Sequence, residues 1–145
     1  MLGLIQRVSK ASVSIEGLIT GQIDLGILLF LGVQKSDSKA DAEKLLQKVL
    51  NYRIFPDAEA KMNLSLSDVG GGLLVISQFT LAADTNKGLR PSFSAAAKPE
   101  HAEILYNYFI ESAVANHPII QSGIFGANMQ VSLCNDGPVT FILNS

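Results

Sequence analysis

Two uninterrupted apolar runs, Ile27–Val33 and Leu73–Ile76, constrain the fold of this chain most strongly. A strand with apolar side chains on both faces is stable only where both faces are covered, so each run is typical of a buried strand. The residues of Leu2–Ile15 and Leu18–Ile23 alternate instead, which predicts an N-terminal hairpin in the same sheet. Other layers must therefore cover this sheet.

Two segments have the periodicity of amphipathic helices. Residues 39–51 repeat apolar side chains every three or four positions, and Ser38 with Asp41 supplies an N-terminal cap. The same period starts again after Pro99 and is expected to end near His117. With 145 residues, 48% of them hydrophobic, one domain spanning 1–145 can bury a core without metal or disulfide support. We expect an α+β fold, with a strongly curved antiparallel or mixed sheet and two amphipathic helices alongside.

The remaining segments give weaker signals. Residues 52–55 and 62–66 predict short extended pieces, and the run that starts at Leu73 is expected to continue as a strand to Phe79. Residues 82–99 lack a clear period and predict a long loop, a kind of segment that is often functional in compact domains. Beyond an irregular stretch, Met129–Cys134 and Val139–Leu143 predict two last strands joined by a hairpin turn.

Composition limits the functions of the chain. Eleven Lys and Arg against thirteen Asp and Glu give a net charge of −2, which disfavours broad wrapping of nucleic acid but allows a local RNA contact. The single cysteine, Cys134, is expected as a buried structural thiol in a reducing compartment. No segment approaches the roughly eighteen apolar residues of a membrane helix, and the N-terminus lacks a signal-peptide pattern. We expect a soluble cytoplasmic protein with no membrane partner.

The turn Asn135–Thr140 is the first candidate for function. Pro138 has a fixed φ and no N–H, and it keeps Gly137 out of the α region, so the turn presents acceptors rather than donors. If the Gly137-Pro138 bond is cis, the neighbouring carbonyls can point to one side and form a rigid ligand for a cationic amine. The sequence leaves the isomer open, and a plain hairpin turn explains the same residues.

A second motif, Ser77-Gln78-Phe79-Thr80-Leu81, begins where polar groups interrupt the Leu73–Ile76 run. Further motifs are Leu4–Val8, Tyr52–Phe55, Lys61–Leu64 and the basic loop Lys87–Phe93. Together with the turn, and in this order and spacing, they closely resemble the D-aminoacyl-tRNA deacylase family over nearly the whole chain. The resemblance implies hydrolysis of the ester bond of D-aminoacyl-tRNA, which releases the D-amino acid and tRNA. We expect no cofactor and no metal. It also implies a barrel-like sheet and a homodimer with its sites at the subunit interface.

The resemblance also assigns site residues. It implies that the 3′ acceptor end of the tRNA meets catalytic positions at Ser77, Gln78, Phe79 and Thr80. It implies substrate-binding positions at Gly137, Pro138, Arg7 and Met129. In this scheme a Gly-cisPro motif reaches into the partner's pocket, and its main-chain oxygens capture the α-ammonium and reject L-aminoacyl esters. Arg7 would hold that turn and Met129 would line the pocket. Glycine has no side chain to clash, so glycyl-tRNA is expected to be cleaved too.

The residues themselves give little support to acid–base catalysis by side chains. His101 and His117 flank the second helix and are expected on the surface, so a catalytic triad or a zinc site is poorly supported. An aminoacyl ester is already activated, and its neighbouring ribose hydroxyl can shuttle a proton, so orientation and oxyanion stabilisation suffice. Thr80 has no visible base beside it, which favours a positioning role over nucleophilic attack.

Two other functions remain open. A small-molecule esterase or peptidase would use Thr80 as its nucleophile and would form a trapped acyl adduct. A non-catalytic nucleic-acid-binding dimer would use the 82–99 loop, where Lys87, Arg90 and Lys98 supply positive charge and Phe93 supplies a stacking surface. The acidic balance of the chain disfavours this second alternative.

Overall fold

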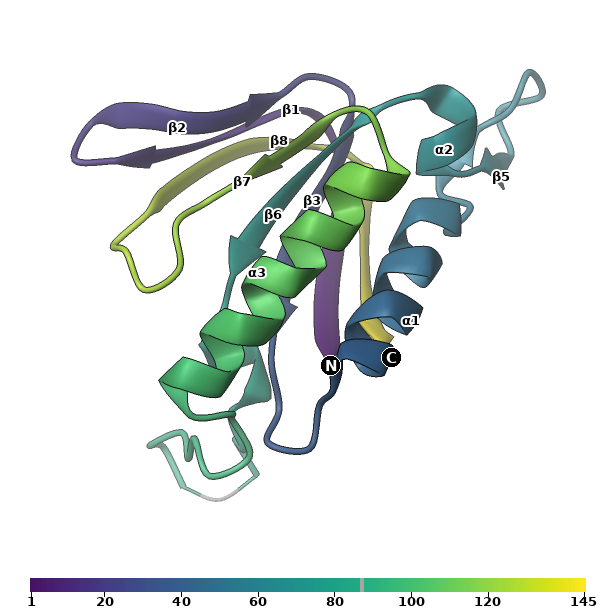
Figure 1. Cartoon of the computed structure of the whole chain (residues 1–145). Helices are drawn as coiled ribbons and strands as arrows, with labels where there is room; N and C mark the ends of the chain where they lie inside the picture. The colour runs from purple at the N-terminus through teal and green to yellow at the C-terminus, as the bar shows by residue number, and fades with distance from the viewer. Residues whose placement is uncertain (87) are drawn as a thin grey trace.

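The structure is a computed structural model that describes residues 1–86 and 88–145. A six-stranded mixed sheet curves into a nearly closed barrel, and two long helices, α1 and α3, lie beside each other against it (Figure 1). In chain order the elements are β1 (Leu2–Ile15), β2 (Leu18–Ile23), β3 (Gly26–Gly32), α1 (Lys39–Asn51), β4 (Phe55–Pro56), β5 (Met62–Leu64), α2 (Leu66–Val69), β6 (Gly72–Ser77), the 3₁₀-helix η1 (Phe79–Ala82), α3 (Pro99–Asn116), β7 (Ile120–Ser122) and β8 (Gln130–Asn144).

The long strand β1 holds the sheet together. It pairs antiparallel with β3 along its first half, with β2 along its second half, and with β8 along both. On the far side of β3 the sheet continues in parallel through β6 to β7. The two ends of this strand order, β2 and β7, approach each other: a β-carbon at Gly21 would lie 3.1 Å from the carbonyl oxygen of Ser122. The sheet therefore comes close to closing on itself.

Apolar clusters cover both faces of the sheet. On one face Ile5 and Leu29 meet Leu45 of α1 and Phe109 of α3, and all four side chains are fully buried. On the other face Leu28 of β3 belongs to a second cluster inside the curve of the sheet. Because neighbouring residues of a strand point to opposite faces, the uninterrupted apolar run of β3 serves both clusters.

Strands β3 and β6 start with glycines that touch. A β-carbon built on Gly26 would lie 1.9 Å from the carbonyl oxygen of Gly72, closer than any two non-bonded atoms can approach. The parallel pairing runs from this point to Leu31 and Ser77. The glycines thus allow the two most apolar strands to lie at normal sheet spacing from their first residues.

The main elements agree with the sequence predictions. The hairpin of Leu2–Ile15 with Leu18–Ile23 is confirmed, as are the helix at 39–51 and the second long helix after Pro99. The Ser38 N–H donates to Asp41 Oδ2 at 2.9 Å, so the predicted pairing of Ser38 with Asp41 forms as a capping box. The α+β class with a curved, barrel-like mixed sheet is confirmed as well.

Several local predictions are wrong. The strand expected at 73–79 stops at Ser77, because the next residues coil into η1. The extended piece at 62–66 stops at Leu64, because Ser65 caps the short helix α2 through hydrogen bonds with Asp68. In the segment 52–55 only Phe55 is paired. The irregular stretch before Ala127 contains β7, which has only three residues and gives no periodic signal.

The two last strands are in fact one. Gln130–Asn144 forms the single strand β8, which pairs with β1 on both sides of the glycine-proline segment, so that segment is a bulge and not a hairpin turn. The prediction of a buried Cys134 is wrong, because the residue pairs with Lys10 of β1 where both side chains are exposed. His117 is buried, with Nε2 lying 2.6 Å from the Gly71 carbonyl oxygen.

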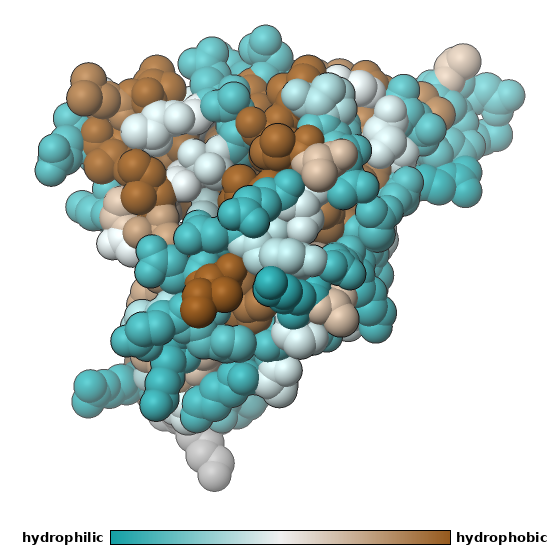
Figure 2. All heavy atoms as spheres, in the orientation of Figure 1, coloured by the Kyte–Doolittle hydropathy of each residue, from teal (hydrophilic) through white to brown (hydrophobic). Residues whose placement is uncertain are grey.

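The surface seen in Figure 2 is largely polar over both long helices, with apolar residues gathered at the upper left, over the β1–β2 hairpin. Leu18 and Ile19 of that hairpin are largely exposed. Of the helices in the described ranges, none combines the length and the apolar character needed to cross a membrane.

Candidate active site

The end of β6 supplies the first part of the site. Side chains are buried up to Ile76, whereas residues 77 and 78 are half-buried and residues 79 and 80 are exposed. The Gln78 N–H donates to the Leu31 carbonyl at 2.8 Å, which extends the pairing with β3 one residue beyond the strand. The chain then leaves the sheet through η1. Polar and main-chain groups are therefore held on a strand end whose position the core fixes.

A cleft of about 460 Å³ opens beside this strand end. Its walls come from the end of β6, the start of α3 and the segment between β7 and β8, which lie far apart in the sequence. Four of the sequence-predicted residues line it, namely Ser77, Gln78, Phe79 and Met129. The other lining residues are Ile76, Ala97, Pro99, Ala102, Phe125, Gly126, Ala127 and Val131. This described lining contains no Asp, Glu, His, Cys, Lys or Arg.

Thr80 does not line the cleft, but it contacts a residue that does. Gln78 Nε2 donates to Thr80 Oγ1 at 2.6 Å. In a one-turn 3₁₀-helix the first N–H groups, here those of Phe79 and Thr80, have no carbonyl of their own helix to bind. Main-chain donors thus stand at the edge of the cleft, next to the amide of Gln78.

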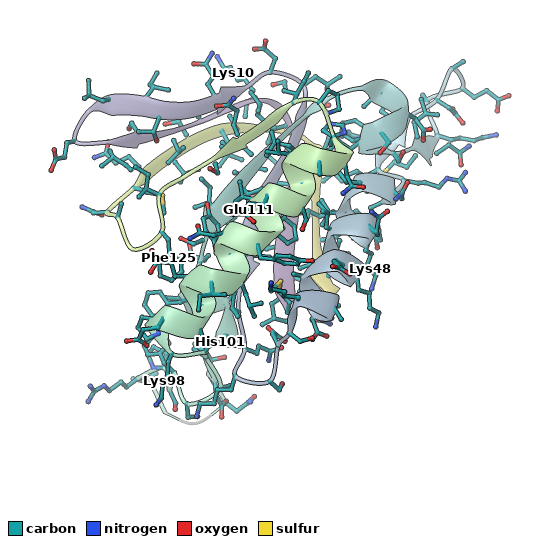
Figure 3. The ribbon with its side chains drawn as sticks, in the orientation of Figure 1. Lys10, Lys48, Lys98, His101, Glu111 and Phe125 are labelled. Carbon is teal, nitrogen blue, oxygen red and sulfur yellow. The ribbon has the colours of Figure 1, made fainter. Side chains whose placement is uncertain are left out.

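Tyr106 of α3 supports the cleft from behind. Its hydroxyl lies 3.0 Å from the carbonyl oxygens of both Val75 and Gly123, so it links β6 to the segment after β7. Its ring centroid is 5.9 Å from that of Phe125, which lines the cleft and lies beside α3 in Figure 3. Burial raises the pKa of Tyr106 to about 12, so this hydroxyl keeps its proton at neutral pH.

The second group of predicted residues lies at the bulge of β8. Val8 pairs with Asn135 and Gln6 with Thr140, so the four residues 136–139 stand opposite Arg7 alone. The Gly137–Pro138 peptide bond within the bulge is cis. Gly137 has a φ of +133°, a conformation that favours glycine, and a β-carbon there would lie 3.1 Å from Arg7 Nη2.

Arg7 fastens this bulge to the rest of the protein. Its Nε donates to the Asp136 carbonyl oxygen at 3.0 Å, and its Nη1 donates to the Ile54 carbonyl oxygen at 2.7 Å. The Asp136 carboxylate adds an ion pair at 3.3 Å. The Arg7 side chain is only 11% exposed, and these acceptors offset the cost of removing its charge from water. On the other side the Val139 N–H donates to Asn135 Oδ1 at 3.1 Å.

The cleft and the bulge lie apart within one chain. Ser77 pairs with Leu31 of β3, whereas Arg7 pairs with Ile27, four residues back along the same strand. Those four residues span about 13 Å along β3, so the two backbones are offset by about that distance in the strand direction. Gly137 lies beyond Arg7 on the next strand. The structure therefore groups the predicted residues into two places and does not bring them together.

The 82–99 segment reaches the cleft at its end, where Ala97 and Pro99 line it. Asp84 and Ser92 exchange main-chain hydrogen bonds of 2.7 and 2.9 Å, and the Ala97 N–H donates to the Val33 carbonyl at 3.0 Å. Arg90 and Lys98 are exposed on this segment, as expected for its positive charge. Lys87 lies outside the described residues.

Sequence reasoning missed the apolar wall of the cleft and its support. Phe125 and Ala97 carry no chemistry that marks them as site residues, and only the fold brings them to the cleft. The sequence could have indicated Tyr106, because a tyrosine at a buried helix position usually needs a hydrogen-bond partner for its hydroxyl. Across the part of the chain that the structure describes, no three His, Cys, Asp or Glu side chains lie close enough to hold a metal ion.

Comparison with known proteins identifies relatives over the full length. Residues 4–144 match a family model described as D-Tyr-tRNA(Tyr) deacylase. The chain is 60% identical to a D-aminoacyl-tRNA deacylase of Pseudoalteromonas atlantica, over 99% of each sequence. It is 59% identical to one of Cellvibrio japonicus, over 99% of this chain and 98% of the relative.

Solved structures share the fold. One titled c-Myc DNA Unwinding Element Binding Protein has a TM-score of 0.96 at 39% identity, covering 100% of this chain and 99% of that one. Another, titled as a structural analysis of a probable eukaryotic D-amino acid tRNA deacylase, has a TM-score of 0.85 at 14% identity, covering 99% of this chain and 98% of that one. At that identity the second likeness supports the fold alone.

Proposed function

The chain belongs to the D-Tyr-tRNA(Tyr) deacylase family and is a D-aminoacyl-tRNA deacylase, a hydrolase, and we propose that it recognises its substrate mainly with main-chain groups contributed by two subunits. One observation carries the proposal: the cleft beside Ser77–Phe79 has no ionisable side chain in its described lining. Proton transfer then has to come from the substrate, and orientation has to come from neutral groups of the protein.

In the proposed reaction the terminal adenosine and its ester occupy the cleft, and the ester carbonyl faces the N–H groups of Phe79 and Thr80. A water oxygen bonds to the carbonyl carbon, and the resulting oxyanion accepts hydrogen bonds from these donors. The bond to the ribose 3′ oxygen then breaks. The 2′ hydroxyl relays a proton from the attacking water to that leaving oxygen, so the amino acid and the tRNA are released without a protein base.

The bulge of β8 is proposed to serve the cleft of a second copy. The α-ammonium of a bound substrate lies within a few ångströms of its ester carbonyl, whereas strand register offsets the bulge of the same chain from the cleft by about 13 Å along the strands. The register also places Ile142, Leu4, Phe30 and Ile76 side by side across four strands. Ile142 is 70% exposed and Ile76 lines the cleft. This apolar row suits a homodimer whose sites lie at the subunit interface.

Selection between mirror-image substrates follows from that arrangement. The partner's carbonyls around Gly137 and Pro138 bind the α-ammonium, and Arg7 holds those carbonyls in place. With the ester and the ammonium fixed, the side chain of a D-residue points into the cleft, and that of an L-residue meets main chain. Met129 contributes to the wall on which the D-side chain packs. Glycine has no side chain and is cleaved as well.

We further propose that the partner is the 3′ acceptor end of aminoacyl-tRNA and that the protein acts in the cytoplasm, where such substrates are used. The exposed thiol of Cys134 suits a reducing compartment, because an accessible cysteine without an internal partner would be oxidised elsewhere.

Deacylation of D-, L- and glycyl-esters on one tRNA tests the selection. The D- and glycyl-esters are expected to be hydrolysed and the L-ester to be spared, and rapid hydrolysis of the L-ester would overturn the proposal.

Subunit mixing tests the shared site. Dimers that combine a Gly137→Ala chain with a Gln78→Ala chain contain one site with both changes and one site with neither. Recovery of activity on mixing supports a shared site, and no recovery contradicts it.

Two rival functions are tested by the same assays. Thr80 as a nucleophile is disfavoured because its hydroxyl accepts from the Gln78 amide, which cannot act as a base. A nucleic-acid-binding module without turnover is kept as a second candidate because one related structure, 39% identical, is named as a DNA-element-binding protein. Tight binding of tRNA or DNA with no hydrolysis of any ester would favour that candidate.

A further inference from the structure

Phe79 and Phe93 form an exposed aromatic pair on the rim of the cleft. Their ring centroids are 5.2 Å apart with the planes tilted by 49°, and the side chains are 60% and 41% exposed. Phe79 comes from η1 and also lines the cleft, whereas Phe93 comes from the segment before α3. Two adjacent large rings left in water mark a surface suited to a partner.

Exposed cations lie on the same segments as this pair or on a segment bonded to them. Lys35, Arg90 and Lys98 are exposed, and the Lys35 N–H donates to the Ala95 carbonyl at 3.2 Å, which brings two of these segments together. Lys98 directly precedes the start of α3, where Figure 3 labels it. None of the three forms an ion pair with another residue of the described ranges.

Acidic groups near this rim are few, and Asp37, two residues after Lys35, is buried and paired with the N-terminal amine at 2.7 Å. Asp84 is the one acidic residue in the segment 82–99, and its Oδ1 accepts hydrogen bonds from the main-chain and side-chain nitrogens of Asn86 at 2.9 and 2.8 Å. Glu100 follows in the first turn of α3. The opposite wall of the cleft, in the segment 118–135, contains no charged residue at all. Cations and exposed aromatic rings thus lie on one side of the cleft only.

We propose that the Phe79–Phe93 pair, together with Lys35, Arg90 and Lys98, binds the unpaired cytidines that precede the terminal adenosine of the tRNA. This inference rests on the proposed function, which places the adenosine in the cleft, so the strand has to leave over one of its rims. Exposed aromatic rings stack on bases without regard to sequence, and lysine and arginine bind the phosphates between them. Among the described residues around the cleft, only the rim at Phe93 has exposed aromatic rings together with lysine and arginine.

Comparison of two substrates tests the inference. A D-aminoacyl ester of adenosine alone cannot reach the rim, whereas the same ester of the trinucleotide cytidylyl-cytidylyl-adenosine can. Phe93→Leu keeps an apolar side chain and removes the aromatic face, so kcat/KM for the trinucleotide ester is expected to fall roughly tenfold relative to the adenosine ester. Phe93→Tyr should restore the ratio. Ile104→Ala, which removes an exposed apolar side chain from α3, serves as the matched control and should leave the ratio unchanged.

The other outcomes overturn the inference. Equal losses on both substrates would mean that Phe93 only shapes the cleft, and no loss on either would mean that its ring contacts no nucleotide. If the unmodified protein hydrolysed neither ester, the proposed function would fail. Nucleotide binding by the rim would then be measured with uncleavable 3′-amide analogues of the adenosine ester and the trinucleotide ester. Roughly tenfold weaker binding of the trinucleotide amide by Phe93→Leu would then support the rim, and unchanged binding would refute it.

Discussion

Arg7 Nε donates to the main-chain oxygen of Asp136 at 3.0 Å, so a side chain of β1 closes the gap that three extra residues open in β8. The same guanidinium reaches the Ile54 carbonyl on the segment after α1. The bulge proposed to sort substrates is thus held by a residue that lies far from it in the sequence. The position of the bulge depends on the planar guanidinium of Arg7, which donates in two directions at once, and lysine has no such group.

Arg7→Lys should therefore loosen the bulge while keeping the charge. We expect the free energy of unfolding to fall by about 1–2 kcal/mol, because at least one of these hydrogen bonds is lost. Rejection of the L-ester should weaken more than hydrolysis of the D-ester slows. Urea denaturation and paired ester assays measure both effects, with Lys10→Arg on the exposed face of β1 as the control. An unchanged D-to-L ratio would contradict the role given to Arg7.

Gly26→Ala should disrupt the sheet at its most apolar pair of strands. The added methyl group would meet the Gly72 carbonyl at 1.9 Å, and neither backbone can move without breaking the β3–β6 pairing. A loss of about 3 kcal/mol or more in the free energy of unfolding is expected. Gln22→Ala, at an exposed position of β2, should lose much less in the same denaturation experiment. Equal losses in the two variants would argue against the close approach.

Tyr106→Phe should cost stability at neutral pH, because the carbonyls of Val75 and Gly123 lose their shared donor. About 1–2 kcal/mol is expected from denaturant unfolding. The cleft should also become less well ordered, since Phe125 packs beside this ring. A matching rise in KM would report that effect.

The same residue predicts a response to alkali. Its pKa is raised from 10 to about 12 in the folded protein, so the unfolded chain loses its proton first as the pH rises. The stability that Tyr106 contributes is complete below pH 10 and is lost through pH 12, with about 1.4 kcal/mol gone by pH 11. The stability difference between the unmodified protein and Tyr106→Phe should shrink by that amount between pH 9 and pH 11. A constant difference would show that the hydroxyl is not buried in solution.

Thr80→Val keeps the shape of the side chain and removes the oxygen that accepts from Gln78. If Thr80 only positions Gln78, kcat/KM for a D-aminoacyl ester should fall by about fivefold to tenfold, in proportion to one neutral hydrogen bond. Complete loss of activity, with an acyl adduct on Thr80 detected by mass spectrometry in the unmodified protein, would instead support a nucleophilic threonine.

The sheet was largely predictable, because the period of a strand reflects burial directly. The alternation of Leu2–Ile15 correctly identified a strand of the N-terminal hairpin, and the continuous apolar run in β3 correctly identified a strand covered on both faces. The glycine-proline segment was not interpreted correctly, since a bulge and a hairpin turn use the same residues. The pairing partner distinguishes them, and that partner, β1, lies at the other end of the chain.

The site was predictable only where a motif or a polar group marked it. Gln78 and Phe79 do line the cleft, and Arg7 does contact the bulge, as the sequence motifs suggested. Phe125 and Ala97 are ordinary apolar residues in sequence, and they belong to the site only because α3 and the segment after β7 pack against β6. Such walls arise from tertiary packing, which no local pattern encodes.

In β8 the residues that pair with the neighbouring strand are separate from the residues proposed to bind substrate. Since β1 grips β8 both before and after residues 136–139, the ladder keeps its alignment whatever occupies that span. Residues 136–139 could therefore be replaced by segments of other length and chemistry that bind other amines, while the pairing of β1 with β8 stays the same.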